Sequence, residues 1–269
     1  MEQKEFDKAK ENADHFKYQS MMYTDYEEVM EYKIERNDEK GVILFGKDEE
    51  TGFWNLLFAV NEAEDLLSAI PAEEKGIRLS FVPESFVPAL KQAGFVTYAV
   101  WNDYFKMSLN DVVDDNEGEL LTEEECRAAS DVTKSCAGQS RGFTGQSEEW
   151  FQKWINASEI SGIETGTKDN AVFIYKADGQ IAGIVCTAVY GHESKKGPTC
   201  WIREVAVRKE YQNQGIARRL IGQALSYGKK HGATRAFLHA DECNTGAIHL
   251  YKSIGFEAKA DQAEINMVR

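Results

Sequence analysis

The stretch from Arg203 to Ala217, REVAVRKEYQNQGIA, places the strongest constraint on what this chain can fold into. The pattern leading into it predicts a strand over residues 199–207, and the polar residues that follow predict a turn. From about residue 215 to 231 the apolar residues recur at helical spacing, which predicts a helix. The sequence therefore predicts a central strand, a glycine-marked turn and a long helix in direct succession.

The turn between this strand and this helix has the composition of an anion-binding site. A helix start has unpaired backbone N–H groups and the positive end of the helix dipole. Gln212, Asn213 and Gln214 add side-chain amides, while Gly215 and Ala217 allow a ligand to approach the backbone. These features favour a pyrophosphate site, but a single glycine at such a turn is more often only a turn. The pattern is neither a P-loop nor the G-x-G-x-x-G dinucleotide fingerprint.

Three motifs in fixed order extend this prediction. They are V-A-V at 205–207, Q-x-x-G-x-A at 212–217 and N-x-x-A-x-x-L-Y-x-x-x-G-F at 244–256. In these motifs, residues 119–269 resemble the GNAT superfamily of acetyl-CoA-dependent N-acetyltransferases. The resemblance implies an α/β fold with a mixed sheet, in the order β-α-α-β-β-β-α-β-α-β-β.

The resemblance also implies how acetyl-CoA is held. In this family the central strand splays from its neighbour, so that its backbone groups are available to the pantetheine arm and the thioester. The turn is expected to cover the pyrophosphate, and Asn244 is expected to contact coenzyme A while it caps its helix. The expected cofactor-binding residues are Val205, Ala206, Val207, Gln212, Asn213, Gln214, Gly215, Ile216, Ala217, Arg218 and Asn244.

Acetyl transfer to an amine also needs a base for the amine and an acid for the departing thiolate. Tyr251 lies on an apolar helix face, which favours a core residue, but the family's L-Y before G-F favours a general acid. Glu204 alternates with Ile202 and Ala206, so we expect a partly desolvated carboxylate with a raised pKa that suits a base. A salt-bridged strand glutamate explains Glu204 equally well. A water chain, His239 or His249 are the alternatives.

Acceptor recognition is expected from loops, where function varies on a shared scaffold. Arg141 and Phe143 lie in the loop at 138–146, and Trp150 lies on the helix after it. We expect direct attack of a primary amine, from a small molecule or a peptide, within a ternary complex. The alternative is a non-catalytic acyl-CoA-binding regulatory or interaction module.

The first part of the chain repeats a piece of the second. LKQAGFVTYAVWNDYFKM, from Leu90, resembles YKSIGFEAKADQAEINM, from Tyr251, and in both a helix ends at Gly-Phe before an expected strand pair. Aligning Gly94 with Gly255 puts Leu90 at the position of Tyr251. We expect a degenerate GNAT-like domain at 1–112, a linker at 113–118 and a catalytic domain at 119–269.

Charge is concentrated in the first part of the chain. Residues 1–118 hold 26 acidic and 12 basic side chains, whereas residues 119–269 hold 19 of each. Such a field repels nucleic acid and anionic membranes. Five cysteines without a C-x-x-C pair, and histidines without ligand spacing, predict neither disulfides nor a metal site. No apolar run is long enough for a membrane span and no secretory signal is seen, so we expect a cytoplasmic monomer or homodimer.

Overall fold

The computed structural model describes residues 1–48, 51–72, 74–113, 118–156, 169–259 and 263–269. Its contacts divide the chain into two compact units. Unit 1 is Met1–Trp101 together with Ala263–Arg269, and unit 2 is Asn102–Gln262. The strand β6 (Val96–Lys106) therefore gives its first residues to unit 1 and its last to unit 2. No helix in the described ranges is long and apolar enough to cross a membrane.

Unit 1 is a twisted sheet with helices against it. Its sheet has the order β2-β3-β4-β5-β13-β6, and β1 pairs with β4. Hydrophobic residues of β3 and β4 bury against α1 on one face, and a second cluster includes residues of α3 and α4. The elements are α1 (Gln3–Ala13), β1 (Tyr18–Gln19), α2 (Tyr26–Val29), β2 (Lys33–Asp38), β3 (Gly41–Lys47), β4 (Trp54–Val60), α3 (Ala63–Leu67), β5 (Ile77–Leu79), the 3-10 turn η1 (Glu84–Phe86), α4 (Val87–Gln92) and β13 (Glu264–Val268).

Unit 2 has a mixed sheet in the order β6-β11-β10-β9-β8-β7, and β12 pairs with β6. Antiparallel pairs run from β7 to β10, while β10 and β11 are parallel. The elements are β7 (Glu119–Leu120), η2 (Glu123–Glu125), α5 (Cys126–Ser135), α6 (Glu148–Ile155), β8 (Asn170–Ala177), β9 (Gln180–Tyr190), β10 (Thr199–Val207), η3 (Lys209–Tyr211), α7 (Ile216–Lys230), β11 (Arg235–Asp241), α8 (Thr245–Ile254) and β12 (Glu257–Ala258).

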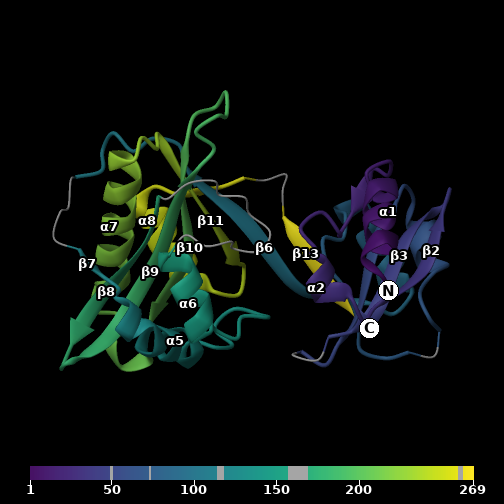
Figure 1. Cartoon of the computed structure of the whole chain (residues 1–269), viewed down its shortest axis with the longest axis horizontal. Helices are drawn as coiled ribbons and strands as arrows, with labels where there is room; N and C mark the ends of the chain where they lie inside the picture. Colours follow the sequence, from purple (N-terminus) through teal and green to yellow (C-terminus); the bar gives the residue numbers. More distant parts are fainter. Residues whose placement is uncertain (49–50, 73, 114–117, 157–168, 260–262) are drawn as a thin grey trace. The chain divides into compact units, whose positions relative to one another are not determined.

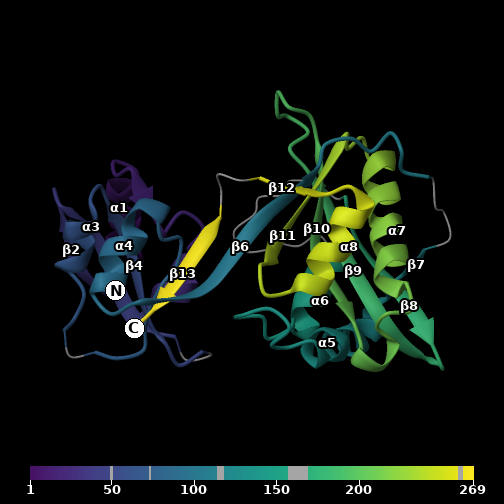
Figure 2. The same cartoon turned by 180° about the vertical axis from the view of Figure 1, so that it is seen from behind.

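Helices cover both faces of the unit 2 sheet (Figures 1 and 2). One core joins the sheet to α7 and α8 through residues such as Leu220 and Ile221, and a second joins it to α5 and α6 through Phe151 and Trp154. Ser147 caps α6, since its Oγ accepts the Trp150 N–H at 3.0 Å. The mixed α/β fold expected from the sequence is confirmed, as are the central strand and the helix after it.

The strand pairings after the two Gly-Phe sequences differ from the prediction. Residues 96–106 form one continuous strand, not the strand pair, a hairpin of residues 96–100 and 104–109, expected after Gly94-Phe95. After Phe256, β12 pairs with β6 in unit 2, whereas β13 pairs with β5 and β6 in unit 1. Both predictions were wrong because local turn composition does not report which distant strand completes a sheet.

The division by contacts also falls elsewhere than the expected domain boundary. It lies between Trp101 and Asn102, inside β6, and assigns the C-terminal strand to unit 1. Most of the expected linker, residues 114–117, lies outside the described residues. The pairing of a degenerate domain with a catalytic one stays a proposal, to which the Discussion returns.

Candidate active site

The two parallel strands at the centre of unit 2 pair over only part of their length. Thr199, Cys200 and Trp201 of β10 are in register with Arg235, Ala236 and Phe237 of β11. Beyond Trp201, residues 202–207 continue to pair with β9 but have no pairing to β11. Within the part of the chain that the structure describes, one edge of β10 is therefore left without a partner strand over residues 202–207. Backbone N–H and C=O groups on such an edge are available to a ligand.

A β-bulge on β10 lies where this opening begins. Ile202 pairs with Thr187 and Glu204 with Cys186, so Arg203 is the extra residue. The bulge changes the alternation of side chains: Ile202 packs in the core beneath α7 and α8, whereas Ala206 packs in the core beneath α5 and α6. The prediction that Glu204 shares a face with both was therefore wrong for Ile202. The bulge could not be predicted from the alternation of side chains along the strand, because that alternation assumes a regular strand without an extra residue.

Glu204 is buried, with 7% of its surface exposed, and one of its two carboxylate oxygens has two hydrogen-bond donors. Its Oε1 accepts hydrogen bonds from Gln146 Nε2 at 2.8 Å and Arg203 Nη1 at 2.6 Å. Burial raises the pKa of Glu204 above its ordinary 4.5, and Arg203 and Gln146 oppose part of that rise. A carboxylate in this setting can hold a proton more readily than one in water, which is the property required of a base.

Tyr251, on α8, is partly buried against the core beneath α7 and α8. Its ring lies 6.5 Å from that of Tyr104 and 6.3 Å from that of Phe256, measured between centroids. Burial, and then the charge of Glu204, raise the pKa of Tyr251 to about 12. The phenol consequently stays protonated at neutral pH. Among the described residues no hydrogen-bond partner of its hydroxyl is found, so the O–H can serve as a donor.

The turn before α7 has the backbone conformation of an anion cradle. Asn213 and Gly215 both adopt positive φ, at 60° and 81°. A Cβ built on Gly215 would meet no heavy atom within 4 Å, so the surface there is open. The first N–H groups of α7, from Ile216 to Arg218, have no partner inside the helix, and no acidic residue lies in that first turn. The positive end of the helix dipole is therefore not neutralised.

The glutamines of this turn use their side-chain amides within the protein. Gln212 Nε2 donates to Val207 O at 2.9 Å, and Gln214 Nε2 donates to Glu210 O at 3.2 Å. Arg218 Nη2 donates to Ser253 Oγ of α8 at 2.6 Å. The side chains thus brace the turn against β10 and α8, and the backbone N–H groups are what the turn offers to a ligand.

Asn244 caps α8, as expected, since its Oδ1 accepts the Ala247 N–H at 3.3 Å. Its Nδ2 donates to Ser140 Oγ at 3.2 Å, which connects α8 to the loop at 138–146. Arg141 in the same loop forms an ion pair with Asp241, at the end of β11, with Nη2 to Oδ1 at 2.5 Å and Nε to Oδ2 at 3.0 Å. The Asp241 side chain is completely buried. The loop is thereby fixed to the strand that has separated from β10.

This ion pair changes the picture of Arg141. Its guanidinium also reaches Glu242 Oε1 at 3.4 Å, and its own backbone N–H donates to Asp241 Oδ2 at 2.7 Å. The structure thus gives Arg141 the function of an anchor between the loop and β11. Phe143 packs partly against the core beneath α5 and α6, and Trp150 stacks on Trp154 with centroids 5.0 Å apart.

Arg203 was not among the catalytic or binding residues predicted from the sequence. Its guanidinium lies over the rings of Trp150 and Trp201, at 5.9 and 5.4 Å from their centroids, and pairs with Glu204. An Arg-Glu pair next to each other in a strand ordinarily points to opposite faces. Only the bulge brings both to one face, and no sequence signal marks it.

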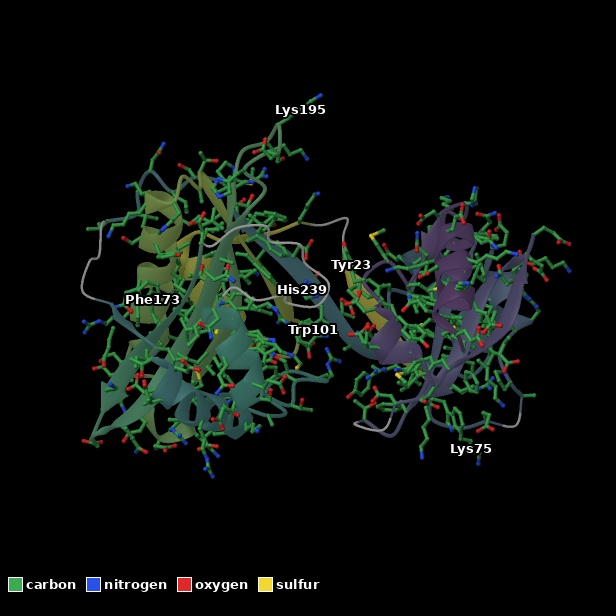
Figure 3. The ribbon with its side chains drawn as sticks, in the orientation of Figure 1. Tyr23, Lys75, Trp101, Phe173, Lys195 and His239 are labelled. Atoms are coloured by element: carbon green, nitrogen blue, oxygen red, sulfur yellow. The ribbon has the colours of Figure 1, made fainter. Side chains whose placement is uncertain are left out.

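The alternative bases lie elsewhere. His239, labelled in Figure 3, is on β11, where its Nδ1 is 2.8 Å from Asp103 Oδ1 of β6. His249 is exposed on α8. Within the described ranges, no cluster of three or more potential ligands could hold a metal ion.

Comparisons with known proteins agree with this geometry. Residues 137–256 match the model of the acetyltransferase (GNAT) family. An uncharacterized N-acetyltransferase of Methanocaldococcus jannaschii is 30% identical over 111 residues, 41% of this chain and 45% of that protein. A spermidine N(1)-acetyltransferase of Escherichia coli (strain K12) is 24% identical over 115 residues, 42% of this chain and 60% of that protein. This chain therefore spans only about half the length of these relatives.

Comparison with solved structures supports the fold. A GCN5-related N-acetyltransferase from Sphaerobacter thermophilus superposes with a TM-score of 0.56 at 15% identity, over 85% of this chain and 76% of that one. The resemblance expected from the three motifs is confirmed by the family match, which spans all of them. Residues 137–256, within unit 2, therefore form a domain of the acetyltransferase (GNAT) family.

Proposed function

We propose that unit 2 is an N-acetyltransferase that transfers an acetyl group from acetyl-CoA to a primary amine of a small molecule or peptide. The observation that carries this proposal is the unpaired edge of β10 at residues 202–207, next to the turn at 212–218. Backbone groups on the edge fit the amide-rich pantetheine arm, and the N–H groups at the start of α7 fit the pyrophosphate. The open space above Gly215 admits a ligand to the backbone.

The chemistry of the two titratable groups supports direct attack in a ternary complex. Glu204, whose pKa burial raises, accepts the proton that the attacking amine must lose. Tyr251 keeps its proton at neutral pH and donates it to the departing thiolate. The acyl C–S bond breaks as the new C–N bond forms, so the products are an amide and a free thiol. Holding both substrates in place supplies much of the acceleration.

The test is release of free thiol from acetyl-CoA by the full chain, against a panel of amines, amino acids and peptides. We expect turnover on at least one primary amine, with the acetylated product confirmed by mass spectrometry. Calorimetric titration with coenzyme A gives the second readout. Coenzyme A binding without turnover on any acceptor would favour the non-catalytic acyl-CoA-binding module instead, and absence of both would overturn the cofactor assignment.

A further inference from the structure

The bulge at β10 presents one guanidinium beside the candidate base. Arg203 donates from Nη1 to Glu204 Oε1 at 2.6 Å, and about a third of its side chain is exposed. Trp150 of α6 and Trp201 of β10 lie against the guanidinium, so cation–π attraction limits its orientation. An arginine held in this way loses little further freedom when it binds a ligand.

The other two nitrogens of this guanidinium have no hydrogen-bond partner in the described part of the chain. Among the described residues, Nε and Nη2 of Arg203 form no hydrogen bond, whereas Nη1 is engaged by Glu204. Nε and Nη2 together form the edge of arginine that can bind a carboxylate with two parallel hydrogen bonds. In unit 1, Arg78 also lies over an aromatic ring, that of Phe53, but uses this edge, with Nε on Asn55 Oδ1 and Nη2 on Asp48 Oδ2, both at 2.9 Å. Unlike that of Arg78, the Nε–Nη2 edge of Arg203 is therefore available to bind a ligand.

We propose that Arg203 binds an anionic group of the acceptor, so that the preferred acceptor is a small amine with a carboxylate a few bonds from its nitrogen, such as a free amino acid. The inference rests on the proposed function, because it takes Glu204 as the base. Glu204 accepts a hydrogen bond from one nitrogen of the guanidinium, and the free edge consists of the other two nitrogens. All three nitrogens are bonded to the same carbon. The amine and the anion must therefore lie close together. A polyamine has no such anion, and the positive charge of Arg203 disfavours its additional ammonium groups.

The experiment compares matched acceptors that differ only in the carboxylate. Free-thiol release by the full chain is measured with ornithine and putrescine, with phenylalanine and phenethylamine, and with spermidine, at saturating acetyl-CoA. We expect kcat/KM to be about 10- to 100-fold higher for the carboxylated member of each pair, since hydrogen bonds to charged groups contribute on this scale. Equal or higher kcat/KM for the decarboxylated amines or spermidine would overturn the inference while leaving the proposed function intact.

Variants then assign the preference to one edge of one residue. Arg203→Gln should reduce the ratio within each pair to about one without changing the KM for acetyl-CoA. Arg203→Lys, which keeps the charge without the two-nitrogen edge, should retain only part of the ratio. Arg78→Gln in unit 1 is the matched control and should leave the ratio unchanged. If Arg203→Gln lowers both members of a pair equally, Arg203 is structural and the inference fails. Absence of turnover on every acceptor would instead overturn the proposed function, and this inference with it.

Discussion

Each unit contains a helix that ends in the same way, but the side chains on the two helices differ. In unit 1 Gly94 has a φ of 89°, and the Phe95 N–H donates to Leu90 O at 3.0 Å. In unit 2 Gly255 has a φ of 96°, and the Phe256 N–H donates to Tyr251 O at 3.0 Å. This is one and the same glycine-dependent helix end. Both phenylalanines are about 1% exposed, so each fastens its helix to a core.

The side chains around this shared backbone differ in what they can do. Leu90 is fully buried, whereas Tyr251 at the equivalent position has a phenol whose pKa is raised by burial and by the charge of Glu204. The helix that follows the central strand differs as well. In unit 1, α3 has five residues with Glu64 and Asp65 in its first turn, whereas α7 has fifteen and no acidic residue there. Carboxylates at a helix start oppose phosphate binding.

The comparison teaches that burial and backbone hydrogen bonding can form the same helix end and strand arrangement with different side chains at the equivalent positions. Both central strands have an antiparallel neighbour on one side and a parallel one on the other, β3 and β5 about β4, and β9 and β11 about β10. These similarities support the proposal that unit 1 is a degenerate relative of unit 2. The predictions below test where that equivalence ends.

The largest expected effect of removing a charge is on stability, at the ion pair that anchors the loop to β11. Asp241→Asn should lower the free energy of unfolding of unit 2 by about 3 kcal/mol, because it leaves Arg141 without its buried partner. In unit 1, Asp48→Asn removes the charged partner of Arg78. Because Asp48 is more exposed than Asp241, this change should lower the free energy of unfolding by only about 1 kcal/mol. Denaturant titration followed by fluorescence measures both. Equal costs would show that the two pairs are equivalent.

Acid should weaken the same anchor. Burial alone would raise the pKa of Asp241, but hydrogen bonds from Arg141 and Cys243 outweigh it and lower that pKa. A lowered pKa in the folded state contributes stability above the unfolded value of about 3.9 and loses it as the pH falls below that. Asp241→Asn should remove this part of the acid dependence.

The next effect separates the equivalent residues of the two helices. Tyr251→Phe should lower kcat by about 100-fold, the scale of general acid catalysis, with the affinity for coenzyme A unchanged. Leu90→Ala should leave kcat unchanged and lower stability by about 2–5 kcal/mol, because it opens a cavity. Steady-state kinetics and thermal unfolding measure the two. If kcat barely moves in Tyr251→Phe, that residue belongs to the core, as Leu90 does.

A smaller effect is expected when α7 is given the charge of α3. Gly215→Asp should raise the dissociation constant of coenzyme A by about tenfold, since it places a carboxylate at the start of the helix. Gly215→Asn has the same shape without the charge, and asparagine tolerates positive φ, so it is the matched control. Calorimetric titration gives both constants. Equal weakening by both would assign the effect to the loss of open space instead.

Glu204 should give kcat/KM its dependence on acid pH. Its carboxylate form is the base, so kcat/KM should fall as the pH drops through its pKa, which burial raises above 4.5. Tyr251 should add no alkaline limb below about pH 12. In Glu204→Gln the acidic limb should disappear along with most of the activity. A pH–rate profile with an unchanged acidic limb in this variant would reassign the base to water or to His239.

Much of the fold followed from local patterns. The central strand at 199–207, the caps at Ser147 and Asn244, and the glycine before α7 are set by neighbouring residues, and the structure has each of them. The pairing of β13 could not be predicted in this way, because the strands that it joins are more than 150 residues away in the sequence. Short amphipathic strands fit many partners, and only the competition among all strands selects one.

The amino-acid sequence by itself determined the proposed cofactor side of this protein, since the strand, turn and helix from 199 to 230 are contiguous and their backbone geometry follows from local residue types. The acceptor side was decided by tertiary structure. The bulge at Arg203, the approach of Gln146 to Glu204 and the Arg141–Asp241 pair join residues up to 100 positions apart. Such contacts arise when packed layers bring loops together. The free energy of burial does not depend on how far apart two residues lie in the sequence, whereas turn and cap preferences depend on neighbouring residues.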